Sequence, residues 1–408
     1  MIKVAHKRLA IVGVVISALA LSGCAGEATS PKGAASVDPA SLSCIPAPPE
    51  TLPGDPDDVL SEVSGAALTA LGGYPGEVFE SPWRDFEPAS APPWQVGFTG
   101  NEANPANLLQ QAGVQEIIDA NPDLFEPEIL SVTANPANDA ASQIQGMRTL
   151  LQQGADLIIG SLSSPTALNS VIDDAAAAGV PVISLLGQST SKNAVNVQPN
   201  PVQDGYYGAA ELLKKMGASG SVLMVHGIPG LSIDTSIFDA GKAVFDACPD
   251  VEVVGELTGS FDPATTKTET LKFLTTHPGE LNGAFNVANM AYGVISAFEQ
   301  TGRPVPPVAD IGANGASMAY WRDTPDYPGV AVSLQVEGTG RFGMQVGLAM
   351  LQGRGLKINE TPFAPTVITA DNFDEWIDAS WNESSNLYAE GPEAAIPADE
   401  LLSGYFDR

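Results

Sequence analysis

The sequence predicts an α/β protein with two similar lobes, each built on a mostly parallel sheet. From Trp94 onward, short apolar runs alternate with helix-forming segments as far as residue 336. Runs as continuously apolar as these are typical of parallel strands that are covered on both faces. Repeated strand–helix units favour an open α/β sheet. The strands number about nine, too many for one small sheet, and the series divides near residues 195–200.

The apolar runs give the expected strands in chain order. The first lobe is expected to hold strands at 94–100, 127–134, 156–161 and 181–186, and the second at 221–227, 251–257, 283–288, 308–313 and 329–336. Helices fall between them. The best-marked helix begins after the capping residue Ser164, has Pro165 at its first position, and stops at Gly179.

A short polar loop, "GQST" at 187–190, directly follows the strand 181–186. In open α/β sheets, ligands bind where loops leave the carboxyl ends of the strands. We therefore expect this loop, Gln188 included, to face a ligand.

Composition limits the classes of partner. The chain has 408 residues, of which 44% are hydrophobic, enough for two lobes of ordinary size. Its 18 Lys and Arg residues against 48 Asp and Glu residues give a formal charge of −30. A chain this acidic is repelled by phosphate backbones, so nucleic acid is not an expected partner.

The N-terminus predicts export and lipidation. Basic residues precede an apolar run at 9–21, which is too short for a comfortable membrane span. The run ends in "LSGC", which resembles the bacterial lipobox. In that motif the cysteine, here Cys24, is acylated and becomes the first residue once the signal peptide 1–23 is removed. The expected location is the bacterial cell envelope, on the outer face of the cytoplasmic membrane.

Residues 24–92 are expected to form a tether and an N-terminal extension. Residues 25–56 are rich in Ala, Ser, Pro, Gly and Asp and lack periodicity, which indicates a flexible tether. Residues 55–68 are expected to form a helix with acids at its start. The Asp cluster there lacks the glycine and the spaced ligands of an EF-hand loop, so a cap is preferred to a calcium site.

Two cysteines remain once Cys24 carries lipid. Cys44 and Cys248 lie in an oxidising compartment, where an even pair can form a disulfide. Two separate thiols are the other interpretation, and the sequence does not choose between them.

Catalytic chemistry has little support. The histidines beyond the signal peptide, His226 and His277, are far apart and have no Cys or His neighbours at metal-ligand spacing. The chain has no G-x-S-x-G elbow, no G-x-G-x-x-G opening a helix and no phosphate-binding G-x-x-x-x-G-K-[ST]. We therefore predict no enzyme activity, no catalytic residue, no cofactor and no metal site.

Several segments resemble the ribose- and galactose-type solute-binding proteins of ABC transporters. The first, at 144–185, holds "QGADLIIGS" and "AGVPVISL"; the others are "NPVQDGYYGAAELL" within 200–230, "AFNVANMAYG" within 284–302, and "VSLQVEGTGRFG" within 332–353. Their order and spacing carry the resemblance, which covers roughly residues 94–370.

The resemblance implies two Rossmann-like lobes joined by three hinge crossovers that close on a small molecule. It further implies a sugar or polyol ligand, an ABC permease as partner, and a monomer. The crossovers are expected near 196–202, 310–320 and 334–337. The expected division is a first lobe of 93–198 plus 337–370, a second lobe of 199–336, and a C-terminal extension of 371–408.

Carried over position by position, the resemblance implies a polar ligand site. Asn314 and Gln335 match the family best, and Asn286 and Asn289 stand where the family has Asn-Asp. Asn104 matches an Asn-Pro after the first strand, although the aromatic residues that follow in the family are replaced here.

Two departures bear on the ligand. The Asp-Arg pair that grips sugar hydroxyls is replaced by Leu186 and Gly187, followed by Gln188, and the arginine expected after Gly230 is missing. A neutral Gln lacks the charge-assisted, bidentate contacts of that pair. We expect a neutral ligand that has fewer hydroxyls or is gripped by other loops. Sugars and polyols stack their C–H faces on aromatic rings, and the expected walls are Tyr206, Phe238, Tyr320 and Trp321.

Other functions on these lobes are weighed against this one. A sensor that reports ligand to a membrane kinase is the alternative within the same fold. An envelope hydrolase is opposed by the scarcity of catalytic motifs. A transcriptional regulator needs a basic DNA-binding head, and this chain has an export signal instead.

Overall fold

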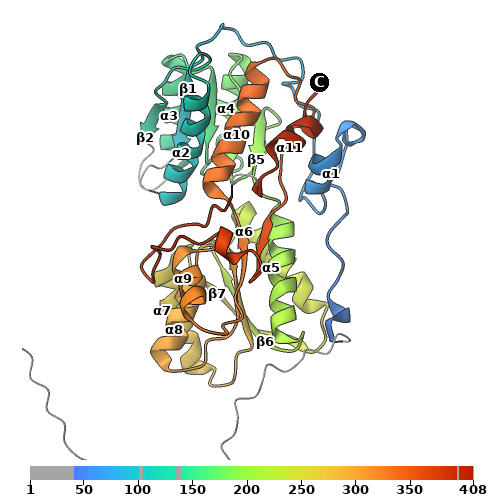
Figure 1. The fold of residues 1–408 in the computed structure, drawn as a ribbon. Coiled ribbons are helices and arrows are strands. Elements are labelled where there is room, and N and C mark those ends of the chain that lie inside the picture. Colours follow the sequence, from blue (N-terminus) through green and yellow to red (C-terminus); the bar gives the residue numbers. More distant parts are fainter. Residues whose placement is uncertain (1–40, 101–103, 134–138, 393–394, 408) are drawn as a thin grey trace, which may run out of the picture. The chain divides into compact units, whose positions relative to one another are not determined.

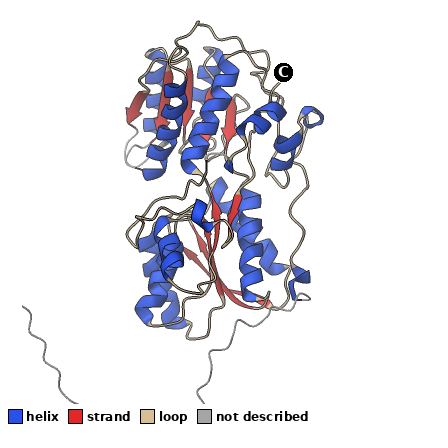
Figure 2. Ribbon diagram, viewed as in Figure 1, coloured by secondary structure: helices blue, strands red, loops and turns tan. Residues whose placement is uncertain are grey.

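Two sheets organise the part of the chain that the structure describes. The computed structural model describes residues 41–100, 104–133, 139–392 and 395–407. Each sheet carries helices on both faces (Figure 1), and the secondary structure is an alternation of strands and helices (Figure 2). The predicted α/β class is confirmed, and every strand expected from the sequence is present.

The first sheet has five parallel strands in the order β2-β1-β3-β4-β5. The unexpected strand is β5, which pairs with β4 from Val182 opposite Ala194 to Leu185 opposite Val197. Its short sequence "AVNV" contains a buried Asn196, which interrupts the apolar signal that marks the other strands. The bounds are β1 (Val96–Gly100), β2 (Leu130–Thr133), β3 (Leu157–Gly160), β4 (Val182–Leu185) and β5 (Ala194–Val197).

The second sheet has six strands in the order β11-β10-β9-β8-β6-β7. All pairs are parallel except β10–β11, which is antiparallel. The unexpected β11 has only three residues, too few to show periodicity. The bounds are β6 (Gly220–His226), β7 (Val251–Thr258), β8 (Gly283–Asn286), β9 (Val308–Ile311), β10 (Val330–Ser333) and β11 (Thr366–Ile368).

Helices cover both sheets. The first sheet is flanked by α2 (Pro105–Ala120), α3 (Ala140–Gln152), α4 (Asn169–Ala177) and α10 (Val336–Leu351). The second is flanked by α5 (Pro201–Met216), α6 (Ser232–Asp246), α7 (Pro263–Thr276), α8 (Ala291–Thr301) and α9 (Gly315–Asp323). The remaining short helices are η1 (Ser41–Cys44), η2 (Leu60–Glu62), α1 (Gly65–Ala70), η3 (Phe373–Glu375) and α11 (Ala398–Tyr405).

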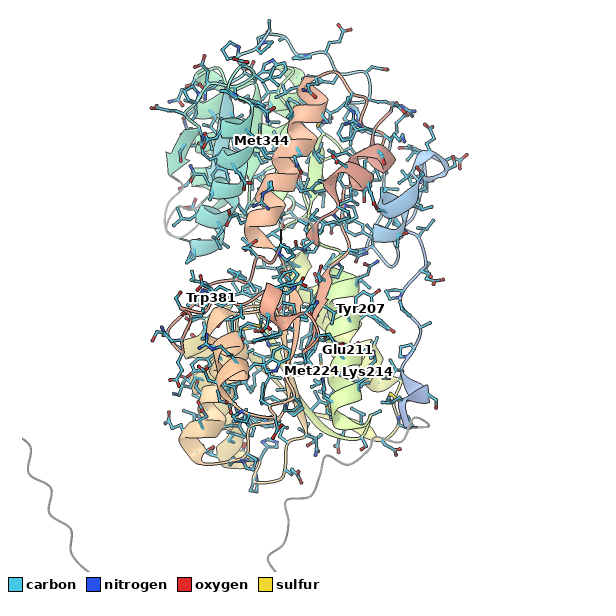
Figure 3. All side chains as sticks on the ribbon, viewed as in Figure 1. Tyr207, Glu211, Lys214, Met224, Met344 and Trp381 are labelled. Atoms are coloured by element: carbon cyan, nitrogen blue, oxygen red, sulfur yellow. A yellow bond between two sulfur atoms is a disulfide. The ribbon has the colours of Figure 1, made fainter. Side chains whose placement is uncertain are left out.

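The strand pattern places the cores. In β3, Leu157 and Ile159 belong to one apolar cluster with α10, and Ile158 belongs to a second cluster with α3 and α4. Successive side chains of a strand point to opposite faces, so a continuously apolar strand fills both cores. Met344 of α10 and Met224 of β6 mark the separate cores of the two lobes (Figure 3).

The start of α5 shows why the sequence forms a helix there. The Asn200 side chain accepts hydrogen bonds from the backbone N–H groups of Val202 and Gln203, and Pro201 occupies the first helical position. These features satisfy helix N–H groups that have no partner within the helix. The helix ends at Gly217, whose φ of 71° is left-handed, as is favourable for glycine.

Two helix predictions were wrong in extent. The helix expected from Pro165 begins at Asn169, because the Pro165 carbonyl accepts from the backbone N–H of Thr190 instead (2.8 Å). The single helix expected over 55–68 is broken into η2 and α1. Val63 is extended and Gly65 has a left-handed φ of 59°, and both interrupt a continuous helix.

The chain passes between the lobes at 198–200, between β5 and α5, and returns at 334–335, between β10 and α10. The crossover expected at 310–320 is wrong, because β9, α9 and β10 all belong to the second lobe. The third crossover lies at 364–365, where the chain leaves a bridge between Phe363 and Pro199 and enters β11. The end of the expected first-lobe range, 366–370, is therefore part of the second lobe.

Both extensions run along the two lobes. The C-terminal extension packs Phe373 and Trp376 on the second lobe and then places α11 against α1 and the first-lobe core. At the N-terminal end, residues 41–56 are packed rather than a free tether: the Tyr206 hydroxyl on α5 donates to Pro46 O (2.7 Å), and Gly54 bridges Glu77. The family-like lobes are thus bound by two additional segments.

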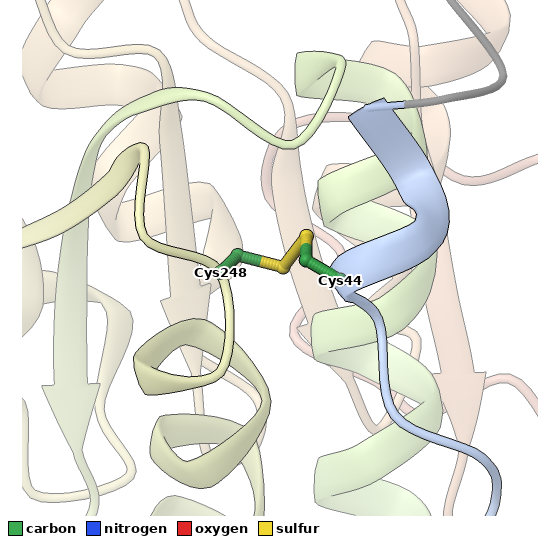
Figure 4. The surroundings of a disulfide bond; sticks show 2 residues. All are labelled: Cys44 and Cys248. Atoms are coloured by element: carbon green, nitrogen blue, oxygen red, sulfur yellow. A yellow bond between two sulfur atoms is a disulfide. The ribbon is translucent and has the colours of Figure 1, made fainter.

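A disulfide joins the N-terminal extension to the second lobe. Cys44, at the end of η1, bonds to Cys248, just after α6, with Cα atoms 5.0 Å apart (Figure 4). This is one of the two arrangements that the sequence left open. Cys24 and the signal peptide lie outside the described residues. Among the helices that the structure describes, none has the length and apolarity needed to cross a membrane.

Candidate ligand-binding site

The carboxyl ends of β9 and β10 carry the best-matched predicted residues. Asn314 follows β9 and caps α9: its side-chain oxygen accepts from the Ala316 N–H (3.0 Å). Its amide nitrogen donates to Asn289, from the loop after β8, and to Asn386 of the C-terminal extension (3.1 Å). Asn289 and Asn314 are therefore brought together, and a third amide, that of Asn386, joins them.

Gln335 lies at the return crossover between β10 and α10. It has a left-handed backbone (φ 47°, ψ 62°) and is only 2% exposed. Its backbone N–H donates to Ser333 Oγ (3.1 Å). Its side-chain Nε2 is buried and has no hydrogen-bond partner within the described chain. A buried amide donor without a partner loses its hydration without compensation. Gln335 Nε2 is therefore able to donate a hydrogen bond to a bound ligand or water.

A segment of the C-terminal extension, residues 385–391, covers these strand ends; we call it the covering segment. The backbone N–H of Gly315 donates to Leu387 O (2.8 Å), and the N–H of Ala389 donates to Ala313 O (2.9 Å). Ser333 Oγ donates to Ala389 O (3.0 Å). Just before this segment, Trp381 (Figure 3) packs near Gly315. The site edge of the second lobe is thus built from β9, β10 and a segment far away in sequence.

Glu390 of the covering segment caps α10. Its Oε2 accepts from the backbone N–H groups of Glu337 (2.8 Å) and Gly338 (3.1 Å) in the first turn. A carboxylate at this end is favoured by the helix dipole. Burial nevertheless raises the pKa of Glu390 to about 7. Its second oxygen, Oε1, is buried and makes no hydrogen bond to the described residues.

Helices α2 and α10 bring first-lobe polar groups to the same place. A Cβ on Gly340 would lie 2.1 Å from Gln110 O, and one on Gly113 would lie 2.1 Å from Glu337 O, so only glycine permits this backbone contact. Gln110 Oε1 accepts from Ser161 Oγ, after β3 (2.8 Å), while its Nε2 is unpartnered among the described atoms. Ser161 and Gln110 therefore form a polar edge beside the first turns of α10.

Two buried aspartates lie beside the second-lobe edge. Asp310 in β9 accepts from the Asn314 N–H (2.8 Å) and from Ser317 Oγ, and its Oδ1 has no partner in the described chain. Burial raises its pKa to about 7. Asp204, in the first turns of α5, is fully buried with neither oxygen bonded by any described residue, and burial raises its pKa well above the ordinary value.

The distribution of unpartnered atoms is not even. Within the described residues, buried side-chain atoms without a hydrogen-bond partner occur in Gln110, Ser163, Asp204, Thr270, Asp310, Gln335 and Glu390. All except Thr270 lie in a strand-end loop, in β9, in the covering segment, or in the helical turns that adjoin them. Each such atom costs about 1–3 kcal/mol unless it acquires a partner. These atoms are donors and acceptors that a bound polar molecule or water could satisfy.

Other predicted polar residues are used within their own lobes. Asn104 is exposed and caps α2 by accepting from the Ala106 N–H (2.9 Å). Asn286 is buried, donates to Ala309 O (2.6 Å) and accepts from the Met290 N–H (3.3 Å), so it holds the loop after β8. For these two residues the structure shows a local structural role.

Gln188 faces a first-lobe network instead of the second-lobe site edge. The side chain interacts with Tyr74 and Glu360. Glu360 is buried and accepts from the Tyr74 hydroxyl (2.7 Å) and from Asn196 Nδ2 (2.6 Å). Gln198 donates to the same hydroxyl (2.8 Å). The loop 187–190 is thus tied to the N-terminal extension and to β5.

The four predicted aromatic walls are packing residues. Tyr206 contacts the N-terminal extension, and Phe238 stacks on His226 with ring centroids 3.5 Å apart. Tyr320 packs edge-on against Tyr327 (5.0 Å). Trp321 lies against Phe373, with ring centroids 4.6 Å apart. Trp321 is about two helical turns beyond Asn314 and lines a small cavity with Asp310 and Ser317.

Sequence reasoning missed Asn386, Tyr388 and Glu390. Tyr388 forms a backbone bridge with Asn314, and its ring lies 3.4 Å from the Cβ position of Gly312. Burial raises its pKa to about 12. Nothing in the local pattern of 385–391 marks these residues, because their partners are more than fifty positions away. No group of three or more potential metal ligands occurs among the described residues.

Comparison with known proteins places this geometry in a family. The model of the periplasmic binding protein domain matches residues 111–355. The ribose import binding protein of Bacillus subtilis is 24% identical over 237 residues, which are 57% of this chain and 75% of that protein. The xylitol-binding protein of Mycolicibacterium smegmatis is 24% identical over 247 residues, 59% of this chain and 69% of that protein.

A solved structure has the same fold. The ABC transporter solute-binding protein of Thermobispora bispora is 27% identical, with a TM-score of 0.64 over 74% of this chain and 92% of that one. The two-lobed arrangement is thus that of type I periplasmic binding proteins. The covering segment lies outside the family match, which ends at residue 355.

Proposed function

Because the chain belongs to the periplasmic binding protein domain family, we propose that it is a solute-binding protein that captures a neutral sugar or polyol for an ABC importer. The observation that carries this proposal is the set of buried polar atoms without partners at the strand ends, above all Gln335 Nε2. In open α/β folds these ends are where ligands bind. The relatives that bind ribose and xylitol support the ligand class.

A hydroxyl-bearing ligand matches the chemistry of the unpartnered atoms. They include donors, on Gln110 and Gln335, and acceptors, on Glu390 and Asp310. A hydroxyl both donates and accepts hydrogen bonds, so a polyol can satisfy both kinds. No described arginine or lysine forms an ion pair with Glu390, Asp310 or Asp204. Among the described residues, therefore, no cation is paired with these carboxyl groups in a way that would hold an anionic ligand.

We expect the protein to act at the membrane surface as a binding protein without enzyme activity. The lipobox at Cys24 would anchor it by acyl chains, each contributing about 0.8 kcal/mol per buried CH₂. The packed extensions then hold the lobes near the permease that receives the ligand. We expect a monomer, with the binding site complete within one chain.

The ligand test is a titration of the purified mature protein with D-ribose, xylitol and myo-inositol. Isothermal calorimetry and thermal shift are measured together. A ligand at a hundred times its Kd stabilises the folded state by about 2.7 kcal/mol. D-xylonate is the control, since it resembles xylitol but carries a carboxylate. Tighter binding of the anion than of every neutral compound, or no binding up to millimolar concentrations, would count against the proposal.

The anchoring test is separate. Cys24→Ala should block lipid attachment and leave the uncleaved precursor, while the wild type partitions into membranes and detergent. Normal cleavage and release of the variant would show that the protein is exported without a lipid anchor.

A further inference from the structure

The covering segment is fixed to the site edge by regular hydrogen bonds. Three hydrogen bonds, all 2.8–3.0 Å long, join Leu387 and Ala389 to the loops that follow β9 and to β10. Asn386, which is exposed, takes up one donor of the buried Asn314 amide. The segment therefore occupies a fixed position over the strand ends, although it lies beyond the family match.

The two carboxylate oxygens of Glu390 differ in their hydrogen bonding. Oε2 accepts from two N–H groups of α10, while Oε1 is buried and unpartnered within the described chain. Capping a helix needs one oxygen of a carboxylate. Arg341, the cation on the same helix, pairs with Glu116 (2.8 Å) and lies 3.8 Å from Glu337. The capping role therefore leaves Oε1 unexplained.

Gln335 and Glu390 lie at the same end of α10: Gln335 is its N-cap residue, and Glu390 caps the N–H groups of its second and third residues. Glu390 Oε2 accepts from the Gly338 N–H, and Gln335 Cβ lies 3.3 Å from the position of a Cβ on Gly338. The donor Gln335 Nε2 and the acceptor Glu390 Oε1 nevertheless do not bond to each other or to any other described atom. One group that both donates and accepts would satisfy the two atoms together, and a hydroxyl is such a group.

We propose that Glu390 is a ligand-contacting, specificity-determining residue that the covering segment adds to the family site: its Oε1 accepts a hydrogen bond from a ligand hydroxyl that Gln335 Nε2 also contacts. The inference rests on the proposed function and narrows it. The ligand must present a hydroxyl, or a pair of adjacent hydroxyls, at this corner. A ligand that presents a carboxylate or a methyl group there is rejected.

The test uses Glu390→Gln in the full mature chain. The amide oxygen of the variant can still accept from the α10 N–H groups, while the buried acceptor Oε1 is replaced by an NH₂ donor. Glu337→Gln is the matched control. Glu337 lies in the turn of α10 that Glu390 caps, and its own carboxylate lies near Arg341 instead. The probes are xylitol, D-ribose and myo-inositol, titrated by calorimetry at pH 8, above the pKa of about 7 for Glu390.

Glu390→Gln is expected to bind the preferred probe roughly tenfold to a hundredfold more weakly, the loss typical of a hydrogen bond to a charged group. Its unliganded Tm should be unchanged or higher, because a buried charge is removed. Glu337→Gln should bind like the wild type. Equal affinity in Glu390→Gln, or a loss that accompanies a fall in unliganded Tm, would overturn the inference while the proposed function stands. Failure of the wild type to bind any probe would overturn both.

Discussion

Replacing Glu360 by Gln tests whether a buried carboxyl in the first lobe makes stability depend on pH. Glu360 is 4% exposed and accepts from Tyr74 and Asn196, and burial raises its pKa from 4.5 to about 7. A raised pKa means that the folded state binds this proton more tightly than the unfolded state. The stability it contributes is present below about pH 4.5 and is lost as pH rises through 7. At 1.36 kcal/mol per pKa unit, the loss amounts to about 3 kcal/mol.

Glu360→Gln should remove this pH-dependent contribution to stability and keep the contacts with Tyr74 and Asn196. The amide introduced by Glu360→Gln can accept from Asn196 Nδ2 through its oxygen and donate to the Tyr74 hydroxyl through its nitrogen. Urea unfolding of the wild type and Glu360→Gln is compared from pH 5 to pH 8. The difference in unfolding free energy should move in favour of the variant by about 2.5 kcal/mol across this range, since a small part of the loss occurs below pH 5. Asp310 and Glu390 titrate in both proteins, so their effects cancel in the difference between the two unfolding free energies. If that difference stays constant from pH 5 to pH 8, the reasoning is refuted.

Other residues give sharper single outcomes. Gln335→Ala should weaken ligand binding roughly tenfold to a hundredfold and leave the unliganded Tm nearly unchanged, because Nε2 has no partner to lose among the described atoms; a fall in Tm alone would contradict this. Asn314→Ala should also lower the unfolding free energy by about 1 kcal/mol, measured in urea, because it removes the α9 cap. Cys248→Ala should destabilise the protein by about 2–5 kcal/mol, and mass spectrometry of unreduced peptides should show Cys44 linked to Cys248; two alkylatable thiols in the fresh wild type would exclude the bridge. Trp321→Leu should leave any ligand-induced fluorescence change intact, since Trp321 packs on Phe373; loss of that change would place Trp321 at the site.

The local pattern predicted nine of the eleven described strands and the polar residues at their ends. Asn314 and Gln335 stand at strand ends, and strand ends follow from where the apolar runs stop. The caps of α5 and α9 are set by residues two or three positions away. Two predictions failed for different reasons. β11 is too short to show periodicity, and the Pro165 carbonyl accepts from Thr190, a contact over 25 positions that local pattern does not reveal.

The sequence by itself determined the fold class, most of the strands along the chain, the absence of recognised catalytic motifs and the strand ends at which a ligand was predicted. These depend on hydrophobic periodicity and on neighbouring residues. Only the tertiary structure decided what covers those ends. Glu390 meets Glu337 across 53 positions, and Tyr74 meets Glu360 across 286, so both contacts depend on the path of the whole chain. That path turned Gln188 toward Glu360, used four aromatic residues in packing, and brought Glu390, from beyond the family match, to the first turn of α10.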